Sequence, residues 1–123
     1  MNRSALRPSA LLAVLVGGAI GSTLRLGIDQ LGLHEIGTLT VNTVGAFVLG
    51  LLTSRLWPTA PAWARAGLGA GLLGSFTTFS AVVVSTVTLP TGLALANLAA
   101  TLVLGLLAAL VGLRLGSRER RAG

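Results

Sequence analysis

The chain has 123 residues, of which 53% are hydrophobic and 10% are charged, and its mean hydropathy of +0.87 excludes an ordinary soluble domain. Its formal net charge of +6 comes from nine arginines without a lysine, and the absence of cysteine excludes disulfides, thiolate metal sites and cysteine nucleophiles. At about 20 apolar residues per helical crossing, the length allows about four crossings. The sequence therefore predicts an all-α membrane protein in which residues 1–123 form a single four-helix transmembrane domain.

The first apolar run follows Arg3 and Arg7 and predicts a crossing at about residues 9–30. A basic start and an apolar core are also typical of a cleaved signal peptide, but this run continues without a clear small-x-small cleavage pattern, which favours a crossing. Arg25 interrupts the run, and no acidic residue lies within the apolar spans to pair with it. Its side chain either reaches the membrane interface or faces an aqueous vestibule, where it would raise the local anion concentration.

A short polar loop then leads to a second crossing at about residues 36–55. Asn42 lies inside this crossing, where an amide must find hydrogen-bond partners. One interpretation is a hydrogen bond to another helix, and the other is donation to a permeating anion. The next loop contains Trp57 and Trp63, which suit the headgroup interface, and two prolines that prevent the helix from continuing.

Residues 66–113 carry no charge and are about twice as long as one crossing. Pro90 lies near the middle of this stretch and divides it into a helical hairpin, with crossings predicted at residues 66–89 and 91–113. In the last crossing, Asn97 and Thr101 are four residues apart and therefore share one helix face. They are candidates for extending a polar track through the membrane.

The most unusual segment is residues 74–80, which combines one glycine, two phenylalanines and four hydroxyl side chains. The hydroxyl groups belong to Ser75, Thr77, Thr78 and Ser80. Such hydroxyls can bond back to carbonyls of their own helix. Their density after a glycine-rich run instead favours a local break in the third helix, which membrane proteins tolerate only where the backbone is buried or lines a water-filled cavity. The freed carbonyls and amides would form an ion site.

The arginines predict the orientation of the chain in the membrane. Two precede the first crossing, two flank the loop between the second and third, and four follow the last, whereas Arg25 is the only other one. The positive-inside bias predicts that both termini are cytoplasmic and that the loop at His34 and the turn at Pro90 lie outside. Because the charge gathers at membrane ends, membrane lipid is a better partner for it than nucleic acid.

No nucleophile with a base, no metal cluster and no membrane-embedded carboxylate can be assembled from the sequence, which argues against an enzyme and against proton coupling.

Three segments resemble one known family in their order and spacing: GGAIGSTLR at residues 17–25, GTLTVNTVGAF at 37–47 and GLLGSFTTFS at 71–80. The chain is similar, over essentially its whole length, to the CrcB/Fluc fluoride channels.

This resemblance implies a fluoride-specific channel of the cell membrane that lowers cytoplasmic fluoride by passive export. It also implies an antiparallel dimer with pores at the interface and a structural, untransported sodium ion held by the backbone carbonyls of Gly74 and Thr77. Asn42 matches the pore-lining asparagine, and Phe79 matches the first phenylalanine of an aromatic pair whose ring edges can face the anion. The remaining candidates for the pore lining are Ser80, Asn97 and Thr101, with Arg25 as the candidate vestibule residue.

The chain departs from the family pattern at Val82, where the second phenylalanine is expected. Together with the one-sided arginines, this departure raises the hypothesis of a heterodimer with an oppositely oriented related subunit. A non-conducting or half-active subunit is thus the alternative to a channel that works alone. A small multidrug exporter has similar length and span count, but its membrane-embedded glutamate is missing from this chain.

Overall fold

The structure is a computed structural model that describes residues 7–123, so Arg3, which enters the arginine count above, lies outside the described residues. No strand occurs in this range. The elements are α1 (Pro8–Asp29), α2 (His34–Arg55), α3 (Ala62–Arg65), the π-helix η2 (Ala66–Leu73), α4 (Gly74–Phe76), α5 (Ser80–Thr88) and α6 (Thr91–Ala122). Four helical segments, Pro8–Asp29, His34–Arg55, Ala62–Thr88 and Thr91–Ala122, are long and apolar enough to cross a membrane. The predicted all-α class with four such helices is confirmed.

Prolines and one glycine set the helix boundaries. Pro8 opens α1, Pro61 directly precedes α3 and Pro90 directly precedes α6, where a missing N–H and a fixed φ are compatible with a helix start. The turn between α1 and α2 passes through Gly32 at a φ of +69°, a conformation that glycine adopts at no steric cost. His34 follows with a φ of +47°, which is uncommon for a residue with a side chain.

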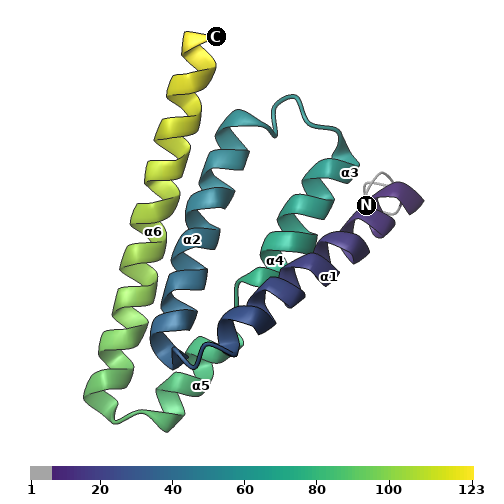
Figure 1. Cartoon of the computed structure of the whole chain (residues 1–123). Coiled ribbons are helices and arrows are strands. Elements are labelled where there is room, and N and C mark those ends of the chain that lie inside the picture. The colour runs from purple at the N-terminus through teal and green to yellow at the C-terminus, as the bar shows by residue number, and fades with distance from the viewer. Residues whose placement is uncertain (1–6) are drawn as a thin grey trace.

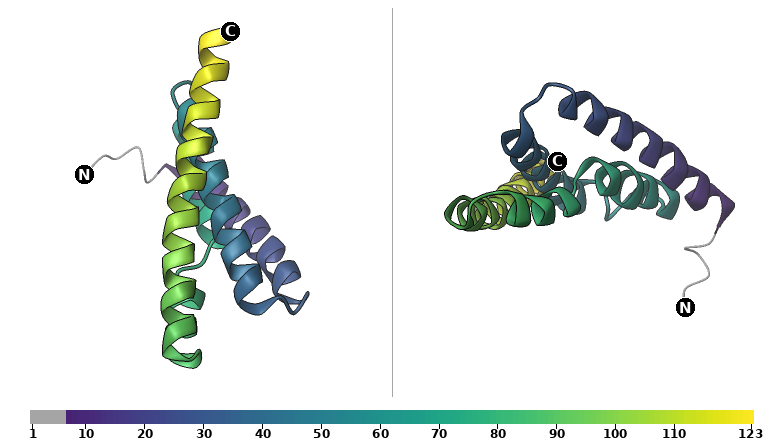
Figure 2. Two further views of the ribbon diagram at one scale, coloured as in Figure 1. Left: turned by 90° about the vertical axis from the view of Figure 1, so that its left-hand side faces the viewer. Right: turned by 90° about the horizontal axis from the view of Figure 1, so that it is seen from below.

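The helices are arranged as two closely packed pairs, α1 with η2 and α2 with α6 (Figures 1 and 2). Glycines make both contacts possible, because a Cβ on Gly17 would collide with the backbone of Gly67 and one on Gly112 with the backbone of Phe47. Small residues allow helix backbones to approach in this way where lipid surrounds them.

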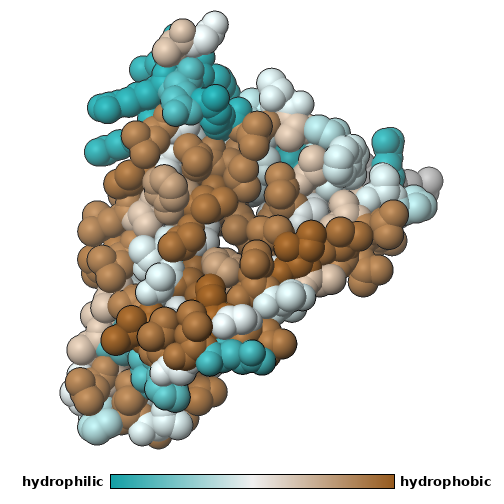
Figure 3. All heavy atoms as spheres, in the orientation of Figure 1, coloured by the Kyte–Doolittle hydropathy of each residue, from teal (hydrophilic) through white to brown (hydrophobic). Residues whose placement is uncertain are grey.

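Very little of the chain is a hydrophobic core in the sense of a soluble protein. The buried apolar residues are few and small or medium in size: Ala10, Val41, Leu73, Val82 and Ala94. Long side chains point outward instead, with Leu15 71% exposed, and Figure 3 shows hydrophobic residues covering the middle of the molecule. An exposed apolar band of this extent suits contact with lipid tails rather than with water.

The third membrane-length segment contains several kinds of backbone structure. Residues 66–73 form wide π-helical turns, which the sequence did not lead us to expect. α4 ends at Phe76, Thr77 has an extended backbone with φ −80° and ψ 158°, and α5 begins at Ser80. Figure 1 shows α4 and α5 joined by residues 77–79, close to α2, and we call these residues the extended stretch after the backbone of Thr77.

Both ends of the described chain and the loop between α2 and α3 lie toward the same end of the molecule, whereas the α1–α2 turn and the α5–α6 turn lie toward the other (Figure 1). This arrangement follows from four long helices joined by short turns. It gathers the arginines near the termini and at the α2–α3 loop toward one end.

Candidate ion pathway

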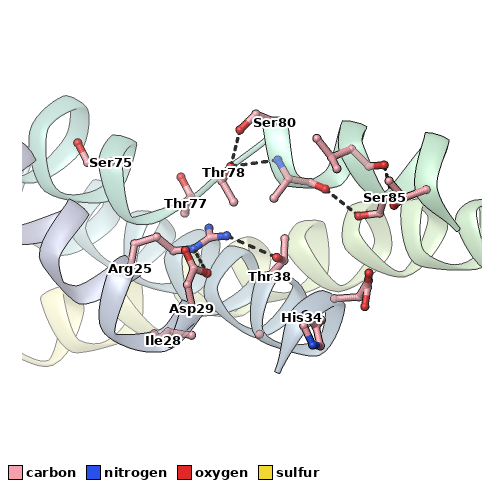
Figure 4. Close-up of a pocket in the computed structure, with 15 residues that line it drawn as sticks. Arg25, Ile28, Asp29, His34, Thr38, Ser75, Thr77, Thr78, Ser80 and Ser85 are labelled. Carbon is pink, nitrogen blue, oxygen red and sulfur yellow. Dashed lines mark hydrogen bonds and ion pairs between the residues drawn. The ribbon is translucent and has the colours of Figure 1, made fainter. Parts of the chain in front are cut away.

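A polar cavity of about 620 Å³ lies between α1, α2 and α5 at the end of the molecule that contains the α1–α2 turn (Figure 4). It is lined by charged and hydroxyl side chains together with a few apolar residues: Arg25, Ile28, Asp29, His34, Glu35, Gly37, Thr38, Ser75, Thr77, Thr78, Ser80, Ala81, Val84, Ser85 and Thr88. Three predicted site residues, Arg25, Thr77 and Ser80, are therefore brought to one cavity. A hollow with this lining can hold water and ions.

Arg25 is the permanent positive charge of this cavity, and its side chain is only 14% exposed. Its Nε donates to Oδ1 of Asp29 at 2.9 Å, and its Nη2 donates to Oγ1 of Thr38 at 3.4 Å. Its Nη1 is buried and has no partner among the described residues. The guanidinium is thus held in place by Asp29 and Thr38, with one nitrogen enclosed.

The expectation that Arg25 lacks an acidic partner was wrong. The crossing predicted at residues 9–30 already contained Asp29, and α1 does continue through it, which places this carboxylate one helical turn from Arg25. The spacing of four residues was the sequence signal that could have revealed the pair. Thr38 was also not predicted as a site residue, and it belongs to a different helix.

Asn42 of α2 is bound to the backbone of Thr78 by two hydrogen bonds. Its Nδ2 donates to the Thr78 carbonyl at 2.9 Å, and its Oδ1 accepts from the Thr78 amide at 2.8 Å. Because one bond needs a donor and the other an acceptor, the pair fixes which way the amide points. These two bonds agree with the interpretation that Asn42 bonds to another helical segment. They leave the second N–H of Nδ2 for another acceptor.

The hydroxyl groups of residues 77–80 have separate local partners. Thr77 donates back to the Leu73 carbonyl at 2.8 Å, as hydroxyls in membrane helices often do. The Thr78 hydroxyl lies 3.0 Å from the Ser80 hydroxyl and accepts from the Ala81 amide at 3.2 Å. Thr78 thereby satisfies an amide at the start of α5.

A second cavity of about 380 Å³ lies on the other side of residues 77–78. Its lining combines residues of α2, the third segment and α6: Asn42, Gly45, Ala46, Leu49, Gly69, Leu73, Gly74, Thr77, Thr78, Phe79, Val82 and Thr101. Thr77 and Thr78 line both cavities, so residues 77–78 lie between them. The extended stretch is therefore the part of the chain that an ion passing from one cavity to the other would meet.

The remaining predicted residues differ in how they are placed. Phe79 is 74% exposed, which leaves its ring free to meet something outside this chain, whereas Val82 is 1% exposed. Thr101 reaches the second cavity, but its hydroxyl donates to the Asn97 carbonyl at 2.8 Å. Asn97 is half-buried and lines neither cavity.

The carbonyls of Gly74 and Thr77 remain available for an ion. The Thr78 amide, which would bond to Gly74 if the helix continued, bonds to Asn42 instead. Across residues 7–123, no side chain and no loop or capping amide donates to either carbonyl. Carbonyl oxygens freed from a membrane helix are suitable ligands for an alkali cation, so the residues present fit a sodium ion.

Comparison with known proteins gives a consistent result. A family model described as CrcB-like protein, Camphor Resistance (CrcB), matches residues 12–113. The chain is 39% identical to a fluoride-specific ion channel FluC of Parabacteroides distasonis, covering 84% of this chain and 89% of that protein. It is 40% identical to one of Thermus thermophilus, covering 85% and 93%, and 39% identical to FluC 1 of Mycobacterium bovis, covering 80% and 83%. The similarity thus covers most of this chain and most of each of these relatives.

Proposed function

Because this chain belongs to the CrcB family, we propose that it is a fluoride-specific ion channel that lowers cytoplasmic fluoride by passive export. The observation that carries the proposal is the match of residues 12–113 to the family, together with relatives named fluoride-specific ion channels at about 40% identity. The chain is a multi-pass membrane protein, as predicted. Since the family is a class of channels, the chain is a transporter and not an enzyme.

We infer that exported fluoride passes residues 77–80 and leaves through the polar cavity. Fluoride is small and strongly hydrated, so N–H and O–H donors must replace its water. Arg25 lines the cavity, and its positive charge would raise the anion concentration there. The second N–H of Asn42 and the hydroxyl of Ser80 are donors next to the extended stretch, and the exposed ring of Phe79 can offer its positive edge.

We propose that two copies assemble as an antiparallel dimer around a structural sodium ion. The Gly74 and Thr77 carbonyls would hold this ion, and two subunits would contribute four such oxygens. A bound sodium ion would supply a positive charge that joins the two subunits and is not itself transported. Transfer of purified protein into sodium-free buffer should abolish fluoride efflux and favour monomers, and return of sodium should reverse both effects.

The proposed orientation places both termini in the cytoplasm of the cell. It is supported by the gathering of arginines toward the end of the molecule that contains the C-terminus and the α2–α3 loop (Figure 1). The polar cavity would then open to the outside. For a chain inserted in this one orientation, cysteines introduced near His34 and near Arg118 should react with an impermeant thiol reagent only from the outer and only from the inner face, respectively. An antiparallel dimer of two copies predicts instead that each cysteine reacts from both faces.

A second candidate function is a half-active or non-conducting subunit of a heterodimer. It is favoured by Val82, which stands where the family pattern has a phenylalanine and is almost completely buried in the second cavity's wall. A partner inserted the opposite way would have to supply the missing ring. A purified chain that forms a conducting homodimer with both orientations present would contradict this alternative.

The deciding experiment is fluoride efflux from liposomes that contain this chain alone, with chloride efflux as the control. We expect fluoride efflux and no chloride efflux. If efflux requires a related chain from the same cell, the heterodimer is correct. The proposed function is wrong if fluoride leaves neither from liposomes with this chain alone nor from liposomes with both chains, or if chloride leaves equally fast.

A further inference from the structure

The last helix is much longer than a membrane crossing requires. α6 has 32 residues, which corresponds to about 48 Å at 1.5 Å per residue, whereas the hydrocarbon core of a bilayer is about 30 Å thick. The apolar part of the helix ends at Leu113, and four arginines occupy its final turns. These turns therefore stand at the level of the lipid headgroups and slightly beyond.

Three of these arginines share one face of α6. Arg114, Arg118 and Arg121 are separated by four and three residues, so they lie above one another on the helix. Gly112 and Gly116 are buried against α2. At about 100° per residue, the three arginines point between about 120° and 180° away from those glycines. We refer to Arg114, Arg118 and Arg121 as the basic face.

Figure 3 agrees with this geometry, because hydrophilic residues gather over the C-terminal end of α6 and project away from α2. Glu119, the acidic residue of this end, lies on a different side of the helix and pairs with Arg55 of α2. Within residues 7–123, no ion pair involves the basic face. Its three positive charges are therefore neither neutralised by the chain nor covered by another helix of the same subunit.

The part of the same face that precedes the arginines is apolar and exposed. Leu107, Leu110 and Val111 are 54%, 41% and 49% exposed and lie on the same side as Arg114. One continuous surface thus changes from apolar to basic where the hydrocarbon core gives way to headgroups. A nucleic acid would match only the basic half of this surface, whereas a phospholipid matches both.

We propose that the basic face is a binding site for anionic phospholipids, whose acyl chains lie along Leu107, Leu110 and Val111 and whose phosphates meet the arginines. Clusters of arginine directly after a membrane helix attract anionic lipid, and each arginine contributes about fivefold in affinity. The three together should favour an anionic over a zwitterionic headgroup on the order of 100-fold. The lipid would hold the cytoplasmic end of α6 at the level of the headgroups.

The test is to titrate the purified full-length protein in detergent with phosphatidylglycerol or phosphatidylcholine and to count the retained lipids by native mass spectrometry. We expect the wild type to retain phosphatidylglycerol selectively. The variant R114Q/R118Q/R121Q should retain it no better than phosphatidylcholine. The charge-matched control R7Q/R65Q/R120Q removes three arginines from elsewhere at the same end and should behave as wild type.

Equal loss of phosphatidylglycerol in both triple variants would overturn the proposal, because it would show an effect of net charge alone. Full retention in the face variant would also overturn it, as would displacement of the lipid by a short DNA duplex at the same charge concentration. Melting temperature and fluoride efflux of each variant serve as checks of folding. Because the readout is retained lipid, the result does not depend on whether the protein conducts fluoride.

Discussion

The two helix pairs and the extended stretch at residues 77–79 are held in place by different means. The α1–η2 and α2–α6 pairs rest on backbone packed against backbone at glycines, over several turns. The extended stretch depends mainly on one side chain from another helix, Asn42, which binds both backbone groups of Thr78. Close packing in lipid is distributed over many atoms, so it supplies a rigid frame, while a polar stretch can be positioned by very few bonds.

This difference predicts different failures. Damage to a glycine contact should prevent assembly of the protein, whereas damage to the Asn42–Thr78 contact should leave a folded protein that conducts poorly.

Gly112→Leu should destroy the fold. A side chain here would collide with the backbone of Phe47 and Leu51 in α2, and those atoms cannot move without separating the helices. We expect little or no monodisperse protein by size-exclusion chromatography. Gly105→Leu is the matched control in the same helix, because nothing lies within 4 Å of the position its Cβ would take. If both variants purify normally, backbone contact at Gly112 is not needed.

Asn42→Ala should abolish most fluoride efflux while the protein still folds. The substitution leaves the amide and carbonyl of Thr78 without partners, at a cost of about 1–3 kcal/mol, which a packed frame can survive. We expect efflux to fall on the order of 100-fold. The control is Thr43→Val, which removes a neighbouring hydroxyl that has no partner among the described residues. Equal efflux in the two variants would show that Asn42 does not position the extended stretch.

Gly45→Ala tests the point where the frame meets the extended stretch. An added Cβ would collide with Cγ2 of Thr77 and push this residue away from α2. We expect about tenfold slower efflux with nearly normal thermal stability. Thr77→Ser removes Cγ2 and keeps the hydroxyl that bonds to the Leu73 carbonyl, so the double variant should recover. Additive losses in the double variant would contradict this contact.

Sequence reasoning predicted the frame well because hydropathy and proline positions are local signals. Three apolar runs and the division of the last run at Pro90 were enough to give the four long helices. The partner of Arg25 was missed because Asp29 lies at the very end of the predicted crossing, next to the polar loop, although the spacing of four residues already places the two on one helix face.

The site was harder to predict because its contacts join distant residues. Asn42 and Thr78 are 36 residues apart, and nothing in either segment specifies the other as its partner. The π-helical turns of η2 also left no recognisable signal in a run of alanine, glycine and leucine. The roles of Gly74, Thr77, Phe79, Ser80, Asn97 and Thr101 in conduction or sodium binding stay predictions.

Asp29→Asn should raise fluoride efflux moderately, whereas the substitutions of Asn42 and Gly45 should lower it. The carboxylate pairs with Arg25 at 2.9 Å, so its replacement by an amide makes the field in the polar cavity more positive, while the amide oxygen can still accept from Nε. We expect fluoride efflux to rise about two- to fivefold at low ionic strength and less at high salt. Glu35→Gln removes a carboxylate that lines the same cavity without contacting Arg25. An equal rise in that variant would show that only the total charge matters.

Glu119→Gln should have the smallest effect. Glu119 pairs with Arg55 and so joins α6 to α2 at the end that we propose to be cytoplasmic. The two side chains are 47% and 60% exposed, and solvent weakens ion pairs as exposed as this one. The glycine contacts one turn below already hold these helices together, so we expect thermal stability to change by no more than about 0.5 kcal/mol and efflux to stay the same. A loss comparable to that of Gly112→Leu would mean that the ion pair, rather than the backbone packing, holds α6 against α2.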